Sequence, residues 1–267
     1  MLPMIAFAFV LGLVVGSFLN VCIHRLPLEE SLLRPGSRCP RCRHPIAPYD
    51  NIPVLSFLLL RGRCRHCRNP ISPRYPAVEA LTAALFAALA WRWSWRPEWA
   101  AAVCAASACL LAIAFIDWDT FLIPDVLSLG LAAAGLAASP LNPLLVGPWA
   151  ASLAGSGPAV RFGFSAAGAV LGFALCWGIA AFGEWLFKKE AMGGGDVKLL
   201  AAVGAWSGAL GAFDCLVIAS LLGSVYGVYR LARGSLRRQD PIPFGPFLSA
   251  AAIFNFFYLL PFGFPFS

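Results

Sequence analysis

Residues 99–116 read WAAAVCAASACLLAIAFI, a run without a charged side chain that leads directly into Asp117. A membrane-spanning helix needs roughly 20 mainly apolar residues, and this run is typical of one. Seven further mainly apolar runs lie at 3–23, 77–93, 125–141, 162–187, 198–212, 213–232 and 245–264. Alternatively, 198–232 forms one hairpin, or one helix with a long re-entrant piece. Because backbone polar groups in lipid need internal partners, and no run alternates like a barrel strand, we predict an all-α polytopic membrane protein with about eight transmembrane helices.

The composition supports a chain that folds in lipid. Of the 267 residues, 60% are hydrophobic and 12% are charged, against about 45–50% and about 25% in a typical soluble domain. These values nearly exclude a soluble globular protein and a disordered one. The net charge of +7 does not by itself indicate nucleic acid binding, because membrane proteins collect Lys and Arg in their cytoplasmic loops.

The basic residues predict how the chain is organised. We expect a first transmembrane helix at 1–23, a cytoplasmic insert at 24–76 that contains ten arginines, and a membrane body at 77–267. Two further basic loops follow the fifth and seventh predicted spans, with Lys188, Lys189, Arg230, Arg233, Arg237 and Arg238. With eight spans, all three loops fall on one side, which is therefore the cytoplasmic side. The loop at 139–160 is expected to be an external linker, and no internal repeat is evident.

The insert carries two C-x-x-C motifs, Cys39-Pro-Arg-Cys42 and Cys64-Arg-His-Cys67, with 21 residues between them. Two such motifs at this spacing are typical of a four-cysteine zinc ribbon, because each places two thiolates on one tight turn. Four thiolates leave no open coordination position, so the predicted zinc site is structural. Redox-active or unpaired thiols are the alternative.

Other residues of the insert leave two questions open. His44 or His66 could replace one thiolate as a ligand. The insert has few aromatic residues, chiefly Tyr49 and Phe57. Because recognition of single-stranded nucleic acid depends on aromatic stacking, we expect no nucleic acid partner.

Two groups of acidic residues border the predicted spans, and an ionisable group at membrane depth is a functional candidate by default. The first group is Asp117, Asp119 and Asp125. Asp125 follows Pro124 and suits the start of a helix, whereas Asp117 and Asp119 have no such explanation. The second is Asp196, which follows three glycines. A helix cap beside a glycine hinge is its simpler explanation.

The predicted topology places Asp117 and Asp196 at one membrane face, although they lie 79 positions apart along the chain. Two carboxylates that share a site cannot both ionise easily, so the pair retains a proton. One can then activate water as a base while the other acts as an acid on a peptide carbonyl. Asp119 is the alternative to Asp117 as the first carboxylate of the pair. The sequence lacks G-x-S-x-G and H-E-x-x-H, the motifs of competing hydrolase chemistries.

Several motifs in order resemble one family. They are Gly16-Ser17-Phe18-Leu19-Asn20-Val21, the two C-x-x-C motifs, Asp117 through Asp125, and Gly193 through Lys198. Together they resemble the type IV prepilin leader peptidases, also called prepilin peptidase/N-methyltransferases, which are aspartic membrane peptidases of the G-x-G-D type.

The resemblance implies a bacterial inner-membrane enzyme with its active site at the cytoplasmic side. It would cleave the basic leader of type IV prepilins or type II secretion pseudopilins at a Gly–Phe bond, with Asp117 and Asp196 as catalytic residues. The residues that would support them are Gly193, Gly195, Lys198 and Asp119. The expected partners are these substrates and membrane lipids.

The resemblance also implies that the new N-terminus is methylated with S-adenosylmethionine. A methyl-donor site would have to be built from the insert and the first spans, because the chain has no G-x-G-x-x-G unit. Glu79 is the candidate residue, and an ion pair with Arg74 is its equally favoured alternative. A different class of function, a membrane transporter or exporter with a zinc-sensing loop, would require ionisable side chains at mid-depth.

Overall fold

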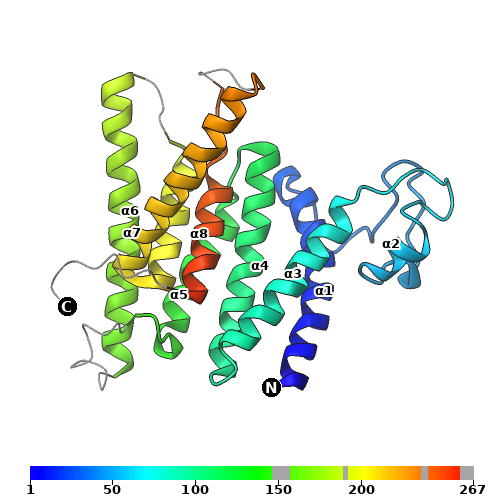
Figure 1. The fold of residues 1–267 in the computed structure, drawn as a ribbon, viewed down its shortest axis with the longest axis horizontal. Helices are drawn as coiled ribbons and strands as arrows, with labels where there is room; N and C mark the ends of the chain where they lie inside the picture. Colours follow the sequence, from blue (N-terminus) through cyan, green and yellow to red (C-terminus); the bar gives the residue numbers. More distant parts are fainter. Residues whose placement is uncertain (146–156, 189–191, 236–239, 259–267) are drawn as a thin grey trace. The chain divides into compact units, whose positions relative to one another are not determined.

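The computed structural model describes residues 1–145, 157–188, 192–235 and 240–258 (Figure 1). Within these ranges the regular structure is helical: eight α-helices, three short 3-10 helices and two isolated β-bridges. The chain divides into two compact units, Met1–Ala112 and Ile113–Ser267. Parts of the predicted 139–160 linker and of the last predicted span lie outside the described residues, as do Lys189, Arg237 and Arg238.

The N-terminal unit is built on two helices that lie side by side, α1 (Leu2–Arg25) and α3 (Arg74–Arg92). Two glycines of α1 allow this contact. A Cβ added to Gly12 would lie 2.6 Å from the Cα of Ala83, and one added to Gly16 would lie 2.7 Å from the Cα of Glu79. Small residues of this kind let helix backbones approach closely in membranes. Along the chain, the insert connects α1 to α3 and contains the short helix α2 (Leu55–Leu59).

The C-terminal unit is organised around α7 (Gly194–Ala232), which contacts α5 (Asp125–Ala138), α6 (Pro158–Phe187) and α8 (Gly245–Phe257). The helix α4 (Pro97–Thr120) begins in the N-terminal unit and ends in this one. Glycines again permit close packing, because Gly168 and Gly172 of α6 meet the backbone of α7 at Gly204 and Leu200.

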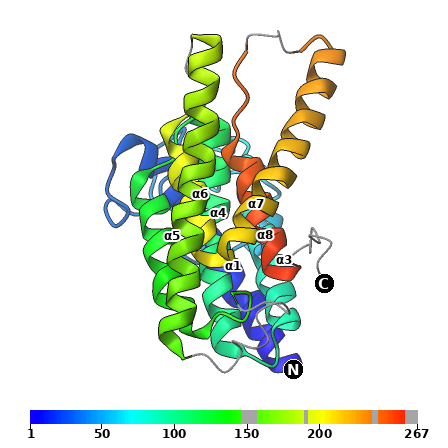
Figure 2. The same cartoon turned by 90° about the vertical axis from the view of Figure 1, so that its left-hand side faces the viewer.

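Helix α7 reverses direction at Gly208, where φ is 72° and ψ is −175°. This backbone conformation is essentially restricted to glycine. Both limbs reach the end of α4: Asp196 of the first limb interacts electrostatically with Asp117, and the Tyr226 ring of the second lies 5.4 Å from that of Trp118. Figure 2 shows the yellow limb descending and the orange limb rising. Of the possibilities left open for 198–232, the structure has the hairpin.

The reversal frees backbone carbonyls that a continuous helix would have bonded. Ser165 donates a hydrogen bond to the carbonyl of Ala205 at 2.6 Å, and the Asn142 amide donates one to the carbonyl of Trp206 at 2.6 Å. Such side-chain donors make a helix break tolerable in an apolar environment.

Among the described residues, four helices are long and apolar enough to cross a membrane. They are Leu2–Leu28, Pro97–Thr120, Pro158–Leu186 and Gly194–Ala232. Two shorter apolar helices cover Asp125–Leu141 and Gly245–Phe257. The prediction of an all-helical fold is therefore confirmed for the described residues, and it contains four long candidate membrane spans.

Candidate functional site

Asp117 lies near the end of α4 and is 5% exposed. Its Oδ2 accepts a hydrogen bond of 2.9 Å from the backbone N–H of Gly245, the first residue of α8. Pro246 has no N–H, and the N–H groups of Phe247 and Leu248 donate to the carbonyl of Phe244 at 3.0 and 3.1 Å. The N–H of Gly245 is thus the donor that the start of α8 directs at Asp117, and the positive end of the helix dipole favours negative charge there.

Asp196 is the third residue of α7 and is partly buried. Its backbone N–H donates to the carbonyl of Gly193 at 3.1 Å. Its Oδ1 is buried and accepts no hydrogen bond from the part of the chain that the structure describes. The structure therefore brings together the two predicted carboxylates, since Asp196 interacts electrostatically with Asp117.

Gly195 has a steric role at this site. A Cβ added to it would lie 2.9 Å from the Cβ of Ile123. Ile123 belongs to the segment that follows Asp117 and leads from α4 into α5. The missing side chain at 195 lets this segment press against the start of α7, which carries Asp196. A Cβ at Gly193 would lie 3.6 Å from Oδ2 of Asp196, an ordinary contact.

Lys198 and Asp125 interact with each other, and Asp119 differs from Asp117 in its exposure. The ammonium group of Lys198 forms an ion pair with both carboxylate oxygens of Asp125, at 2.7 and 2.8 Å. This pair joins the first turns of α5 and α7, so Asp125 is more than a helix-start residue. Asp119 is exposed, whereas Asp117 is buried, because two residues along an α-helix point to different faces.

The sulfur atoms of Cys39, Cys42, Cys64 and Cys67 lie within 4.8 Å of one another, and this cluster could hold a metal ion. The Sγ atoms of Cys39 and Cys67 are 3.8 Å apart, the edge expected of a tetrahedron with Zn–S bonds of about 2.3 Å. Backbone donors, chiefly the N–H of Cys42, lower the pKa of Cys39 to about 7. The chemistry of the donor set therefore fits a soft metal ion.

The two histidines of the motifs lie against each other. The rings of His44 and His66 stack on each other with centroids 4.3 Å apart, and the metal-binding group found among the described residues contains cysteines alone.

The two C-x-x-C motifs are structural copies of each other, a repeat that the sequence analysis overlooked. In the first, the N–H of Cys39 donates to the carbonyl of His44, and the N–H of Arg43 donates back to Cys39. The second repeats both bonds, with Asn69 as the acceptor of the Cys64 N–H and Arg68 as the donor to Cys64. Arg43 and Arg68 both have positive φ, 58° and 60°. Each motif therefore presents its thiolates from the same turn.

Glu79 lies on α3 and is 8% exposed. Its Oε2 accepts a hydrogen bond of 2.7 Å from the N–H of Val54, and Ser17 of α1 lies beside the carboxylate. Both neighbours present neutral groups to the carboxylate.

Two residues near or within the membrane body were missed. Gly245 follows Pro241-Ile-Pro-Phe, and its importance depends on a contact that no local motif announces. Asp214 is 2% exposed, and its Oδ2 has no hydrogen-bond partner in the described residues. It lies six residues after Gly208 on the second limb of α7, so the acids do not all gather at one end of the hairpin.

The fold and the cysteine cluster define a helical membrane protein whose insert carries four cysteines that could hold a metal ion. Family models match the chain along most of its length: residues 10–93 match the bacterial peptidase A24 N-terminal domain, and residues 104–228 match the type IV leader peptidase family. The chain belongs to this family of prepilin leader peptidase/N-methyltransferases.

Similar proteins named prepilin leader peptidase/N-methyltransferase cover most of the chain. That of Burkholderia pseudomallei strain 1026b is 40% identical over 97% of this chain and 86% of the relative. That of Aeromonas salmonicida strain A449 is 38% identical over 94% of this chain and 90% of the relative. That of Pseudomonas aeruginosa is 37% identical over 90% and 86%. No solved structure matches. Family membership removes the case for a transporter.

Proposed function

We propose that Asp117 and Asp196 form the catalytic dyad of a peptidase that cleaves the leader of type IV prepilins or type II secretion pseudopilins at a Gly–Phe bond. The observation that carries this assignment is that Asp117, near the end of α4, and Asp196, at the start of α7, are close enough for their charges to interact. Asp117 is favoured over Asp119 because Asp117 is buried and held by Gly245, whereas Asp119 is exposed.

The surroundings of the two carboxylates support different roles for them. The N–H of Gly245 stabilises negative charge on Asp117, which acts as the base and takes a proton from water as the water oxygen attacks the scissile carbonyl carbon. Asp196 retains a proton and gives it to the carbonyl oxygen. The tetrahedral intermediate then collapses with cleavage of the C–N bond, and the leaving amine takes the proton held by Asp117. Asp196 regains its proton from a hydroxyl group of the intermediate, whose oxygen becomes the carbonyl oxygen of the product acid.

The dyad is tested with isosteric variants of the purified protein in lipid nanodiscs. We expect Asp117→Asn and Asp196→Asn each to lower cleavage of a prepilin-like peptide by at least about 1,000-fold. The matched control is Asp214→Asn, which makes the same change at a buried carboxylate of α7 that has no part in the dyad; we expect its rate to stay within about threefold of the original. Cleavage that survives either dyad substitution would refute the assignment.

We infer that the metal in the four-cysteine cluster is a structural Zn²⁺. Four sulfurs within 4.8 Å of one another, presented by two copies of the same turn, support this inference, as does the distance of 3.8 Å between the Sγ atoms of Cys39 and Cys67. Zinc held by four thiolates has no open position for substrate and would act by ordering the 24–76 insert.

We further propose eight crossings of the bacterial inner membrane, made by α1, α3, α4, α5, α6, the two limbs of α7, and α8. The basic insert and the residues Lys188, Arg230 and Arg233 then lie on the cytoplasmic side with the dyad. This placement favours lipid headgroups and the prepilin as partners, and we propose no nucleic acid partner. Accessibility labelling of single cysteines that placed 193 and 121 on opposite sides of the bilayer would contradict this topology.

A further inference from the structure

The insert exposes an apolar face on its short helix α2. Leu55, Leu58 and Leu59 are 49%, 64% and 73% exposed, whereas Ser56 is buried. The three leucines are spaced i, i+3 and i+4, so they lie together on one side of the helix. Single exposed apolar side chains need no explanation, but an apolar face built by neighbours indicates a contact with a protein or a membrane.

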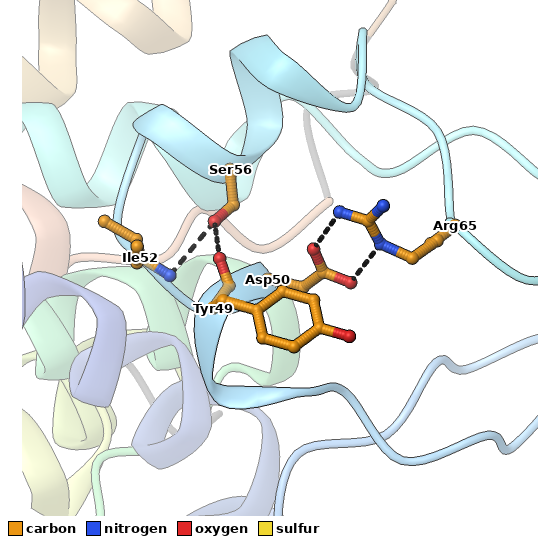
Figure 3. A network of polar contacts seen from close by, with 5 residues as sticks. All are labelled: Tyr49, Asp50, Ile52, Ser56 and Arg65. Carbon is orange, nitrogen blue, oxygen red and sulfur yellow. Dashed lines mark hydrogen bonds and ion pairs between the residues drawn. The ribbon is translucent and has the colours of Figure 1, made fainter.

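The opposite side of α2 is fixed to the rest of the insert, as Figure 3 shows. The hydroxyl of Ser56 donates to the carbonyl of Tyr49 at 3.0 Å and accepts from the N–H of Ile52 at 3.1 Å. Ser56 and Phe57 line a cavity of about 390 Å³ beside Glu79. The three exposed leucines take no part in this lining, so their face is left for another contact.

The fixed side also connects α2 to the cysteine cluster. Asp50 accepts two hydrogen bonds from Arg65, at 2.7 and 2.8 Å, and Arg65 lies between Cys64 and Cys67 (Figure 3). Along the chain, α2 lies between the two C-x-x-C motifs. A contact that fixes α2 therefore also fixes the cluster.

The start of α2 is held at a defined level along the two helices of this unit. The N–H of Val54, the residue before α2, donates to Oε2 of Glu79, and Ser17 of α1 lies beside the same carboxylate. Val54 has a φ of 59°, which is unfavourable for a β-branched residue and persists only where the surroundings fix it.

That level lies inside the ends of both helices. Glu79 is five positions after Arg74, the first residue of α3, and Ser17 is eight positions before Arg25, the last residue of α1. At about 1.5 Å per residue, these separations are about 7.5 Å and about 12 Å. Arginines at the ends of spans reach the headgroups, and this polar layer is about 5–8 Å thick on each side. Helix α2 therefore begins where headgroups meet acyl chains.

Basic side chains follow the apolar face. Arg61 and Arg63 lie within four positions of Leu59 and are exposed, and the insert has ten arginines against three acidic residues. Arginines beside an apolar helix face are typical of an element that lies in an anionic membrane surface. A second copy of the chain would bring the same positive charge, so charge complementarity favours the lipid.

We propose that α2 is an interfacial anchor, in which Leu55, Leu58 and Leu59 enter the cytoplasmic leaflet and Arg61 and Arg63 contact anionic headgroups. The anchor holds the cysteine cluster at the membrane surface. The proposal rests on the topology proposed above, in which α1 crosses the membrane, and not on the dyad.

Fluorescence quenching of the full-length protein in nanodiscs tests the anchor. A fluorescent amino acid replaces Leu58, and the nanodiscs contain phosphatidylglycerol and lipids brominated near the carbonyl end of their acyl chains. We expect bromine to quench this label by at least about twofold, because an interfacial helix lies about 5–10 Å into the boundary. Iodide dissolved in the water should quench it little.

Leu33 is the matched control within the insert. It is also an exposed leucine, but Arg25 donates to the carbonyls of Ser31 and Pro35, both at 2.7 Å, and this holds its segment at the end of α1. A label that replaces Leu33 should respond to iodide and not to bromine. A label that replaces Val14, an exposed residue of α1, should be quenched by bromine and reports on the topology.

Trypsin cleavage after Arg61 gives a second measurement. Leu58→Ser combined with Leu59→Ser should raise its rate in the same nanodiscs by at least about tenfold, because two apolar side chains no longer hold α2 in lipid. Nanodiscs of neutral phosphatidylcholine should raise the rate for the original protein by at least about threefold. Leu33→Ser should leave the rate unchanged. Metal content shows whether each variant has kept its fold, and if one has not, the labels decide.

A label at position 58 that iodide quenches and bromine does not would overturn the proposal. A label there that neither reagent quenches would also overturn it and would indicate a protein contact, such as a second copy of the chain. Unchanged trypsin cleavage in the double serine variant would count against the anchor in the same way. If the label at position 14 also gives no response to bromine, the proposed topology is wrong; if only the label at position 58 gives none, the anchor alone is wrong.

Discussion

The neighbouring glycines at the start of α7 allow a demanding test of how the dyad is assembled. A Cβ added to Gly194 would meet nothing within 4 Å, whereas one added to Gly195 would lie 2.9 Å from Cβ of Ile123. Gly194→Ala and Gly195→Ala therefore make the same chemical change at adjacent positions of one helical turn. Only the second places a methyl group between the start of α7 and the segment that follows Asp117.

The structure sets the size of the expected effect. Carbon atoms in contact prefer a separation of about 3.5–4.0 Å, so the two segments would have to part by about 0.6–1 Å to accept Gly195→Ala. A rotamer change cannot relieve the clash, because the Cβ of Ile123 is attached directly to the backbone. Asp196 would move relative to Asp117 by a similar distance. A misplacement of about 1 Å can cost about 100-fold in rate, or about 2.7 kcal/mol of transition-state stabilisation.

The assay is kcat/KM for cleavage of a prepilin-like peptide by the purified protein in nanodiscs. We expect a loss of about 100-fold for Gly195→Ala and a change within about threefold for Gly194→Ala. Gly194→Ala should also raise thermal stability slightly, by no more than about 1 kcal/mol, because alanine favours the helix. The double variant Gly195→Ala with Ile123→Gly removes the clashing Cβ and should recover part of the rate. If Gly195→Ala alone cleaves at the original rate, the reasoning is wrong.

Three further outcomes are expected. Gly245→Ala places a Cβ 2.8 Å from Oδ2 of Asp117 and should lower peptide cleavage at least about tenfold with metal content unchanged; normal cleavage would show that Asp117 does not need this contact. Lys198→Met should lower the free energy of unfolding by at most about 1 kcal/mol, since its ion pair with Asp125 is largely exposed, and the difference should shrink in high salt; a larger, salt-independent loss would contradict this. Elemental analysis should find about one zinc per chain, lost in Cys39→Ser; zinc retained by that variant would exclude the cluster as its site.

Much of the architecture follows from local patterns in the sequence. The apolar run 99–116 predicts a membrane helix because its length and lack of charge decide its partition into lipid. The two C-x-x-C motifs predict one metal-binding cluster because each motif is a short turn with its own hydrogen bonds. The positions of Asp117 and Asp196 at span ends were likewise predicted, since an acid beside an apolar run is visible in the sequence alone.

The tertiary structure decided what depends on segments remote along the chain. The reversal of α7 falls at Gly208, although several glycines of this stretch would serve as well by composition, because α5 and α6 approach there and their neighbours supply hydrogen-bond donors. The bond from Gly245 to Asp117 spans 128 residues. The ion pair of Lys198 with Asp125 and the cavity beside Glu79 likewise join segments that are remote along the chain. Periodicity and spacing describe which face or turn a residue occupies, whereas the identity of its partner depends on which backbones can approach closely enough to meet.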